Sequence, residues 1–523
     1  MTIGITGEHT ELAASLRGWA AKLGALDVVR AAEGVADESF GPTWQALVGM
    51  GVPTIGLPEV AGGGGGNVLD VAVALGACAH EVVPGPLFST SVAAAVLGET
   101  SGVAERLGDG ASVGLGLRPT LTLSGERLSG TVDVVLDAPG ADLLLLGADD
   151  DSWYVVDAAV ASVDAHAHLD LTRRSGSVDV DAPLAEVTPV PGLTAALLRR
   201  TALTLAAAEA AGVARWCLTT AVEHARVREQ FGSPIGRFQA VKHLCAEMLE
   251  TVESVEAVAW DVAGVAFGVD EQWELAALVA GTVALDGAVR AAQDCIQVLG
   301  GIGFTFEHDA HFRLRRAVAL RSLLGPSDAH AAALAELAAG AVRRRVEVDL
   351  DGRDADVRPR VRQQVGAVAA EPEAERRRAL AESGLLMPHW PAPYGQDADA
   401  VTQLVIDQEL AAAGVSRPDI KIGAWAAPTI LEHGTDEQRD RFVGPTLRGD
   451  LVWCQLFSEP GAGSDLAGLR TRAVRDGDTW VVNGQKIWTS GAHYADWLYV
   501  LTRTDPDAPK HRGISFLLVD KST

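Results

Sequence analysis

The chain contains an internal repeat, and this repeat limits the folds open to it more than any other feature of the sequence. An Ala-Leu pair followed by Gly, Pro and Gly in residues 46–62 returns in residues 379–395 at a constant offset of 333. Residues 129–142 match residues 483–496 at a second offset of 354. Such self-similarity arises when one folding unit is written more than once. The sequence therefore predicts two related copies in tandem, the second stopping at Thr523.

Helical and strand-like patterns alternate along both copies. Leu12, Leu16, Trp19 and Leu23 recur at three- and four-residue steps, as an amphipathic helix requires. Alternating apolar residues with Gly, Asp and Pro punctuation indicate strands between 112 and 190. The pattern predicts a multidomain α protein with small β-domains and a linker near 343–356. The predicted domains are a helical domain (1–110), a β-domain (111–191), a helical bundle (192–345), a second helical domain (346–450) and a second β-domain (451–523).

Composition excludes several classes of protein. A net charge of −26 argues against a general binder of nucleic acid or anionic membranes, because both would be repelled. No N-terminal signal-peptide pattern and no apolar run of about eighteen residues is present, so we expect a cytoplasmic protein without a membrane span. The five scattered cysteines are expected to be buried reduced thiols. His308 and His311 lack further ligands at metal spacing, and no metal site is expected.

The most informative motif is in residues 455–491, where a Ser-Glu-Pro-Gly-Ala-Gly-Ser-Asp turn precedes a Lys-Ile-Trp-Thr-Ser hairpin. Gly461 and Gly463 let the backbone approach a ligand closely. The hydroxyl of Ser458 can reach polar ligand atoms, and Trp488 offers a flat apolar face to a planar ring. We expect Glu459 and Asp465 to hold the turn by accepting backbone N–H bonds.

This stretch closely resembles the flavin-binding β-domain of acyl-CoA dehydrogenases. The resemblance extends along the chain as two protomers fused in tandem, and the uneven pairing is similar to the actinobacterial acyl-CoA dehydrogenases that act on steroid side chains. It implies the family's fold, a helical domain, a β-barrel-like domain and a four-helix bundle, followed by a second helical domain and β-domain. It also implies FAD as the cofactor and Ser464 as a substrate contact. The implied flavin contacts are Gln455, Ser458, Gly463, Ser464, Trp488, Thr489 and Ser490.

Two elements of the first copy resemble the family's contacts to the adenosine side of FAD. The stretch 226–239 reads RVREQFGSPIGRFQ and predicts a helix, a break and a new helix. Its Arg-x-x-Phe-Gly pattern resembles an element that reaches a neighbouring protomer's FAD. A second such element is the QVLGGIGF stretch. The implied adenosine-side contacts are Arg228, Phe231, Gln239, Gln297, Gly300 and Gly301.

The first copy departs from the family at the flavin and at the general base. At an offset of 354, Val134 stands opposite Trp488 and Leu136 opposite Ser490. The family's usual glutamate base corresponds to Leu324, and its less common base position corresponds to Ala202. Neither side chain accepts a proton, so the catalytic residue is unknown, and Glu209 and Asp328 are poor candidates. We expect the base in a helical domain that would follow Thr523.

The complementary losses favour one FAD per fused pair, with its flavin at the second copy and its AMP end at the first. The resemblance implies α,β-dehydrogenation of an acyl-CoA, in which a carboxylate takes the α-proton and a hydride leaves the β-carbon. It also implies electron-transfer flavoprotein as the acceptor and a homo-oligomer, a dimer of fused pairs. Two alternatives stay open: an acyl-CoA oxidase of the same fold, and a non-catalytic partner or scaffold subunit.

Overall fold

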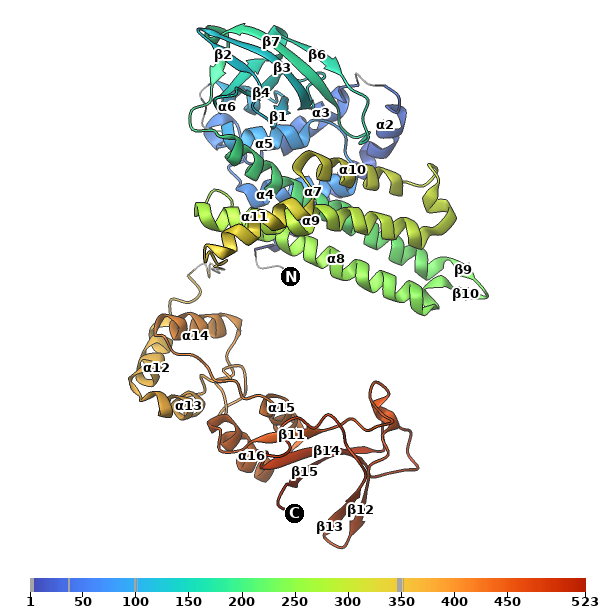
Figure 1. The fold of residues 1–523 in the computed structure, drawn as a ribbon, viewed down its shortest axis with the longest axis vertical. Coiled ribbons are helices and arrows are strands. Elements are labelled where there is room, and N and C mark those ends of the chain that lie inside the picture. The colour runs from blue at the N-terminus through green and yellow to red at the C-terminus, as the bar shows by residue number, and fades with distance from the viewer. Residues whose placement is uncertain (1–3, 36–37, 98–99, 101, 346–349, 351) are drawn as a thin grey trace. The chain divides into compact units, whose positions relative to one another are not determined.

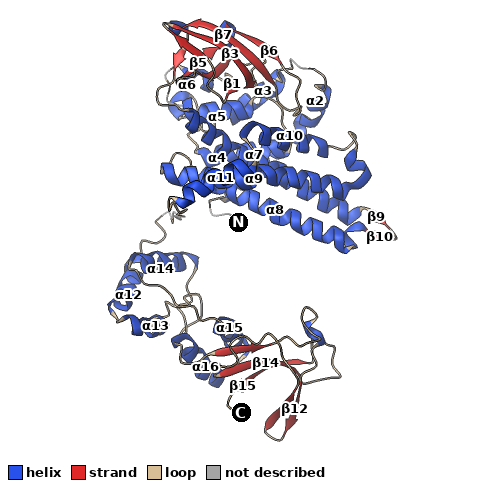
Figure 2. Ribbon diagram, viewed as in Figure 1, coloured by secondary structure: helices blue, strands red, loops and turns tan. Residues whose placement is uncertain are grey.

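A computed structural model describes residues 4–35, 38–97, 100, 102–345, 350 and 352–523. The chain divides into two compact units, unit 1 (Met1–Glu347) and unit 2 (Val348–Thr523) (Figure 1). Part of the predicted linker near 343–356 lies outside the described residues. The predicted fold class is confirmed, since helices and small sheets alternate in both units (Figure 2).

Unit 1 begins with helices that pack on a later helical bundle. The first helix is fixed by a capping box in which Thr6 accepts from the backbone of His9. Its Leu16 is buried, as the helical spacing predicted. Asn67 caps the fourth helix in the same way, after a glycine-rich turn. These helices are α1 (Gly7–Leu23), α2 (Ala25–Ala31), α3 (Gly41–Gly49), α4 (Val68–His80), α5 (Leu87–Leu97) and α6 (Val103–Gly108).

An eight-stranded sheet follows in unit 1. Its order is β6-β7-β3-β1-β4-β5-β8, and β2 pairs with β3. The central strand β1 is parallel to β4 and antiparallel to β3. A bulge between Val132 and Val135 interrupts the pairing of β3 with β7. The strands are β1 (Val113–Gly116), β2 (Thr122–Ser124), β3 (Arg127–Leu136), β4 (Leu143–Gly147), β5 (Trp153–Asp157), β6 (Ala161–Ala165), β7 (Ser175–Pro183) and β8 (Thr188–Pro189).

A helical bundle completes unit 1. The segment Asp270–Phe304 is long and apolar enough to cross a membrane by length and composition alone, although charged residues interrupt it and it holds no unbroken apolar run of about eighteen residues. In the structure this segment includes α9, which packs against four other helices of the bundle, and it is 56% buried over its most apolar window. The elements are α7 (Ala195–Val227), β9 (Glu229–Gln230), β10 (Ser233–Pro234), α8 (Gln239–Gly264), α9 (Asp270–Leu299), α10 (Ala310–Leu324) and α11 (Ser327–Ala339).

The described residues of unit 2 form five α-helices and a smaller sheet. Thr435 caps α16 through a capping box with Gln438. Strand β14 pairs in parallel with β11 and antiparallel with β15, and it touches β12 at one residue pair. The elements are α12 (Arg358–Ala370), α13 (Glu373–Glu382), α14 (Ala400–Ala412), α15 (Gly423–His433), α16 (Asp436–Arg448), β11 (Trp453–Leu456), β12 (Arg472–Asp476), β13 (Thr479–Asn483), β14 (Trp497–Arg503) and β15 (Ile514–Asp520).

The repeat is visible as equivalent backbone. Leu47 in α3 and Leu380 in α13 are both fully buried. Gly51 and Gly384, which follow these helices, have φ angles of 71° and 72°. A side chain is strained in this left-handed region, which accounts for glycine at the same place in both copies. In the sheets, β1 beside β4 repeats as β11 beside β14.

One element was predicted wrongly. The hairpin of unit 2 is β12 with β13, and the Lys-Ile-Trp-Thr-Ser segment that follows it is irregular backbone. The physical reason lies in two local features. Trp488 has a φ angle of 59°, outside the strand region, and the Ile487 N–H bonds the carbonyl of Ser458 and not a strand of the sheet.

Candidate functional site

A buried ion pair organises the motif of unit 2. The Lys486 ammonium donates to Glu459 Oε1 at 2.9 Å and to the carbonyl oxygen of Phe457 at 2.9 Å. Glu459 also accepts from the backbone N–H of Arg470 at 2.6 Å and of Thr471 at 2.8 Å. Both charged side chains are more than nine-tenths buried. These contacts tie the turn, the strand after it and the segment around residue 487 into one braced element.

The protonation of this carboxyl follows from its partners. Burial alone would raise the pKa of Glu459, but hydrogen bonds from Thr471, Arg470 and Lys486 outweigh it and lower the pKa to about 2. Glu459 is therefore a charged structural group at neutral pH. Its predicted role in the turn agrees with the structure, whereas the Asp465 side chain is 76% exposed and lies 3.9 Å from Lys510.

The brace leaves an aromatic face and several hydroxyls open to ligands. Trp488 is 84% exposed and continues directly from Ile487, whose N–H bonds the Ser458 carbonyl at 2.9 Å. A side-chain carbon added at Gly461 or Gly463 would meet no atom within 4 Å. The Ser464 and Ser490 side chains are exposed, and their hydroxyls bond no other described residue. This arrangement fits a planar, polar-edged cofactor.

The remaining predicted flavin contacts frame this surface. Gln455 lies on β11, half-buried beside Tyr499 of β14. Thr489 is half-buried in the irregular segment between Trp488 and Ser490. The Ile487 N–H bonds the carbonyl of Ser458. This bond places Trp488, the residue after Ile487, close to Ser458, although the two are thirty residues apart in sequence.

The predicted adenosine-side residues of unit 1 gather at one end of the bundle. Arg228 ends α7, and Gln297 with Gly300 ends α9; both ends lie on the same side of the bundle in Figure 1. Phe231 is 95% exposed with a φ angle of 53°, and its ring lies edge-on to Phe238 at 5.9 Å. The Gly301 backbone is open, and Gln239 begins α8 with its amide 2.6 Å from His243.

Strand register shows which residues of unit 1 stand at the positions of the predicted flavin contacts. Val113 pairs with Leu143 as Trp453 pairs with Trp497, so the offset between copies is 340 at β1 and 354 at β4. At an offset of 340, Arg118 takes the position of Ser458. At an offset of 354, Val134 takes that of Trp488 and is 53% exposed. Because the offset increases between these strands, the first copy is shorter than the second in the stretch where unit 2 has its glycine turn.

The candidate base positions of unit 1 hold no proton acceptor. Leu324 is 2% exposed at the end of α10, and Ala202 is fully buried within α7. Glu209 is buried between two arginines, accepting from Arg173 and, at 2.8 Å, from Arg316. This pairing makes Glu209 part of the core. Asp328 is exposed in the first turn of α11.

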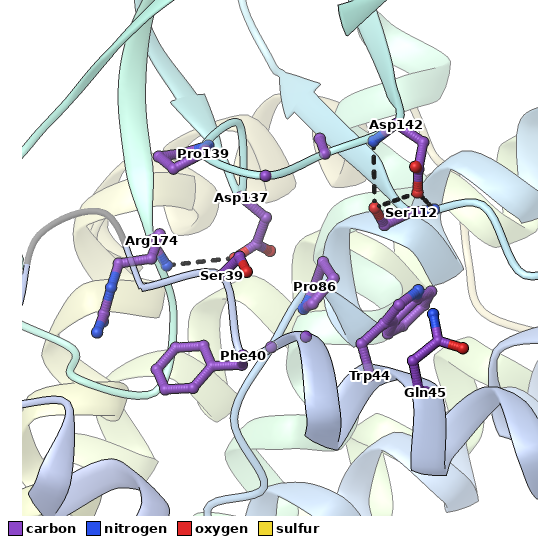
Figure 3. Close-up of a pocket in the computed structure, with 14 residues that line it drawn as sticks. Ser39, Phe40, Trp44, Gln45, Pro86, Ser112, Asp137, Pro139, Asp142 and Arg174 are labelled. Carbon is purple, nitrogen blue, oxygen red and sulfur yellow. Dashed lines mark hydrogen bonds between the residues drawn. The ribbon is translucent and has the colours of Figure 1, made fainter.

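A small pocket between α3 and the sheet of unit 1 is closed by its own hydrogen bonds (Figure 3). Ser112 donates to Asp142 Oδ2 at 2.8 Å, and the Arg174 N–H donates to Asp137 Oδ1 at 3.3 Å. Burial raises the pKa of Asp137 to about 6, against the opposing effects of Arg173 and Ser89. The volume of about 150 Å³ is below that of ordinary ligand pockets, and we read the site as structural.

Comparison with known sequences gives matches along the chain. Residues 196–338 match the C-terminal domain of acyl-CoA dehydrogenases, 354–450 their N-terminal domain and 454–523 their middle domain. The acyl-CoA dehydrogenase FadE34 of Mycobacterium tuberculosis is 46% identical over the whole of this chain and 75% of its own length. The chain belongs to the acyl-CoA dehydrogenase family. Its members are oxidoreductases that use FAD.

Other relatives of this acyl-CoA dehydrogenase match parts of the chain. FadE26 of Mycobacterium tuberculosis is 49% identical over 27% of this chain and 36% of its own length. A solved structure of a steroid acyl-CoA dehydrogenase, Tcur3481-Tcur3483, is 27% identical, covers 64% of this chain and 98% of its own, and has a TM-score of 0.59. The ChsE4-ChsE5 complex from Mycobacterium tuberculosis shares the fold, with a TM-score of 0.60 over 65% of this chain and 99% of its own, at 23% identity. The predicted family and its cofactor are confirmed.

Sequence reasoning missed Lys486 of the site and Arg118, which takes the position of Ser458 in unit 1. Lys486 was read only as part of the Lys-Ile-Trp-Thr-Ser motif, although its ammonium holds the turn in place. A lysine within an apolar segment is a weak signal for a buried partner, and Glu459 was the available acid. Arg118 was not singled out, because it precedes a shortened loop and no motif marks it.

Proposed function

We propose that this acyl-CoA dehydrogenase carries out FAD-dependent α,β-dehydrogenation of an acyl-CoA thioester. The observation that supports it is the braced element of unit 2, in which Glu459 and Lys486 fix the exposed Trp488 beside Ser458. When bound, FAD supplies the hydride acceptor. The chain's own residues would orient it: Trp488 covers one ring face, and Ser458, Ser464 and Ser490 offer hydroxyls to its polar edge.

The substrate we propose is a bulky acyl-CoA, of the steroid side-chain class. The support comes from the relatives: one solved neighbour at 27% identity is described as a steroid acyl-CoA dehydrogenase. Within unit 2, Ser464 is the predicted substrate contact, and its exposed hydroxyl stands in an open turn. A steroid-acyl-CoA that reacts faster than butyryl-CoA supports this proposal, and the reverse preference contradicts it.

Anaerobic reduction of bound flavin tests the activity. We expect purified protein to be yellow, and bleaching when acyl-CoA is added without oxygen would show that the α-proton reaches a base within the protein. Trp488→Ala should lose flavin, whereas Trp480→Ala is the matched control, since Trp480 is 46% exposed on β13, outside the glycine turn and the Lys-Ile-Trp-Thr-Ser segment. Equal flavin content in both variants would contradict the assignment of the ring-facing role to Trp488.

The same preparation separates the alternatives. Electron-transfer flavoprotein is the proposed acceptor, so its reduction should depend on acyl-CoA. Oxygen consumption with acyl-CoA and no added acceptor would instead indicate an oxidase. Protein that stays colourless with added FAD would indicate a partner or scaffold subunit.

The stoichiometry of FAD also stays a prediction. We propose one FAD per chain, served by the flavin-facing residues of unit 2 and by Arg228, Phe231, Gln297 and Gly301 of unit 1. Flavin titration of the full chain measures this number directly, and two FAD per chain would contradict it. Arg228→Ala should weaken FAD binding, because a guanidinium suits a phosphate. The state of association, proposed as a dimer of fused pairs, is measured by sedimentation.

A further inference from the structure

Unit 1 contains a second cavity that the proposed function does not use. It has a volume of about 540 Å³ and lies between the β1–β3 region of the sheet and the end of α10. This size is within the range of small-molecule sites. Arg118 and Val134 line it, and these residues hold the positions that Ser458 and Trp488 hold in unit 2. The cavity therefore corresponds to the flavin-facing surface, with a charge added and an aromatic ring removed.

The polar part of the lining is rich in arginine. Arg118, Arg173, Arg174 and Arg199 line the cavity, with Asp133 and Asp170 as the carboxylates of the lining. Two of these arginines, Arg173 and Arg174, are engaged by other groups of unit 1. His168 adds no charge at neutral pH, because burial and the nearby Arg174 lower its pKa to about 4. An excess of arginine is unusual in a chain with a net charge of −26.

The arginines differ in how far they are neutralised. Arg173 pairs with the buried Glu209, and the Arg174 guanidinium donates to the carbonyl oxygens of Leu171 and Arg173. Arg199 donates to the Leu324 carbonyl at 3.4 Å. Among the described residues, neither Arg118 nor Arg199 makes an ion pair, and both side chains are exposed. These two guanidiniums are available to an anion.

Two buried groups of the lining keep unused hydrogen-bonding capacity. Asp170 and Arg173 are each 5% exposed. Asp170 Oδ2 and Arg173 Nε have no hydrogen-bond partner among the described residues. Buried polar atoms are ordinarily satisfied, so Arg173 Nε beside the cavity points to a bound acceptor, and Asp170 Oδ2 points to a bound water.

The rest of the lining is apolar. Leu117, Val132 and Leu136 come from the sheet side, and Leu320 and Leu323 come from α10. Their side chains offer a continuous hydrocarbon surface, which favours an aliphatic or alicyclic body by burial of apolar area. A purely polar anion, such as inorganic phosphate, would leave this surface in contact with water.

We propose that this cavity binds an amphipathic carboxylate without redox chemistry. The carboxylate lies against Arg118 and Arg199, and the hydrocarbon body lies along the leucines of α10 and the valines of β3. Arginine binds a carboxylate through two parallel hydrogen bonds, which gives both affinity and orientation. Unit 1 would thus hold a ligand site at the position where its sequence has lost the flavin-facing residues.

Equilibrium dialysis of the full, FAD-saturated chain against radiolabelled dodecanoate tests the proposal. We expect saturable binding that the double variant Arg118→Ala/Arg199→Ala weakens by at least about tenfold, since two charge-assisted contacts are removed. Val134→Trp places a ring in the cavity from a half-exposed position and should abolish binding. Arg127→Ala is the matched control. Arg127 lies on β3, the strand that carries Val134, but it does not line the cavity and it pairs with Asp181. Dodecanol, which lacks the charge, should bind at least about tenfold more weakly.

Each other outcome overturns the proposal. Absence of saturable binding, or equal binding by the double variant and the Arg127→Ala control, removes the assigned site. Dodecanoate binding to the FAD-free chain that is lost on saturation with FAD would show that the cavity takes the cofactor. Equal binding of dodecanoate and dodecanol would leave an apolar cavity without anion recognition. Circular dichroism of each variant confirms that the fold is kept, and the arginine double variant decides the result if Val134→Trp does not fold.

Discussion

Replacing Glu459 by glutamine should loosen the flavin-facing element of unit 2 by a measurable amount. The carboxyl titrates at about 2 in the folded chain against an ordinary 4.5. This difference corresponds to about 3 kcal/mol of stability carried by the charged form at neutral pH. Glutamine keeps one acceptor oxygen but leaves the ammonium of Lys486, 7% exposed, without its countercharge. We expect Glu459→Gln to lower local stability by about 2–3 kcal/mol.

Hydrogen exchange followed by mass spectrometry measures this loss in peptides spanning 457–489. Protection should fall by about thirty- to a hundredfold, at about 1.4 kcal/mol for each factor of ten. Glu382→Gln is the matched control, because Glu382 is exposed at the end of α13 in the same unit. The double variant Glu459→Gln/Lys486→Met should recover part of the protection, since it removes the uncompensated charge.

The stability difference between the wild type and Glu459→Gln should change with pH in a defined direction. The pKa of Glu459 is depressed by folding, so its contribution is complete above pH 4.5 and is lost as pH falls toward 2. The advantage of the wild type over Glu459→Gln should shrink to about 1.4 kcal/mol at pH 3. Equal protection of the two proteins at neutral pH, or a difference that does not shrink in acid, would refute the reasoning.

Three further outcomes are expected. Folding raises the pKa of Asp137 to about 6 from 3.8, so the native state of unit 1 should lose up to about 3 kcal/mol as pH rises from 3.8 through 6, and the melting temperature of Asp137→Asn should lack this part of the pH dependence. Glu209→Gln should destabilise unit 1 by about 3–5 kcal/mol in urea unfolding because it leaves Arg173 and Arg316 buried without a countercharge, whereas the exposed Asp328→Asn should not. Leu47→Ala and Leu380→Ala should each cost about 2–5 kcal/mol, each in its own unit, and an effect below 1 kcal/mol at either site would contradict their equivalence.

Much of the fold was accessible from the sequence because periodicity and turn residues act locally. The spacing of Leu12, Leu16, Trp19 and Leu23 predicted a helix that the structure contains as α1. The segment after β13 failed because its conformation depends on a distant carbonyl at Ser458 and on the left-handed backbone of Trp488. Such contacts across the chain leave no trace in a local pattern.

Only part of the candidate site could be predicted from the sequence. The motif identified Ser458 and Trp488, and Glu459 was correctly expected to hold its turn. The partner Lys486 is 27 residues away, and nothing in the spacing links the two. The arginine-lined cavity of unit 1 was not foreseen at all, because its lining comes from strands and helices scattered between residues 117 and 323.

The left-handed backbone at Trp488 has a consequence for engineering. A tryptophan held at a φ angle of 59° carries roughly 1–2 kcal/mol of conformational strain, which glycine would not. Random mutagenesis with selection for heat resistance alone would favour Trp488→Gly. The selected variants would be more thermostable but would lack the aromatic face of Trp488. Screens for greater thermal stability of this protein therefore need to select for flavin retention as well as for heat resistance.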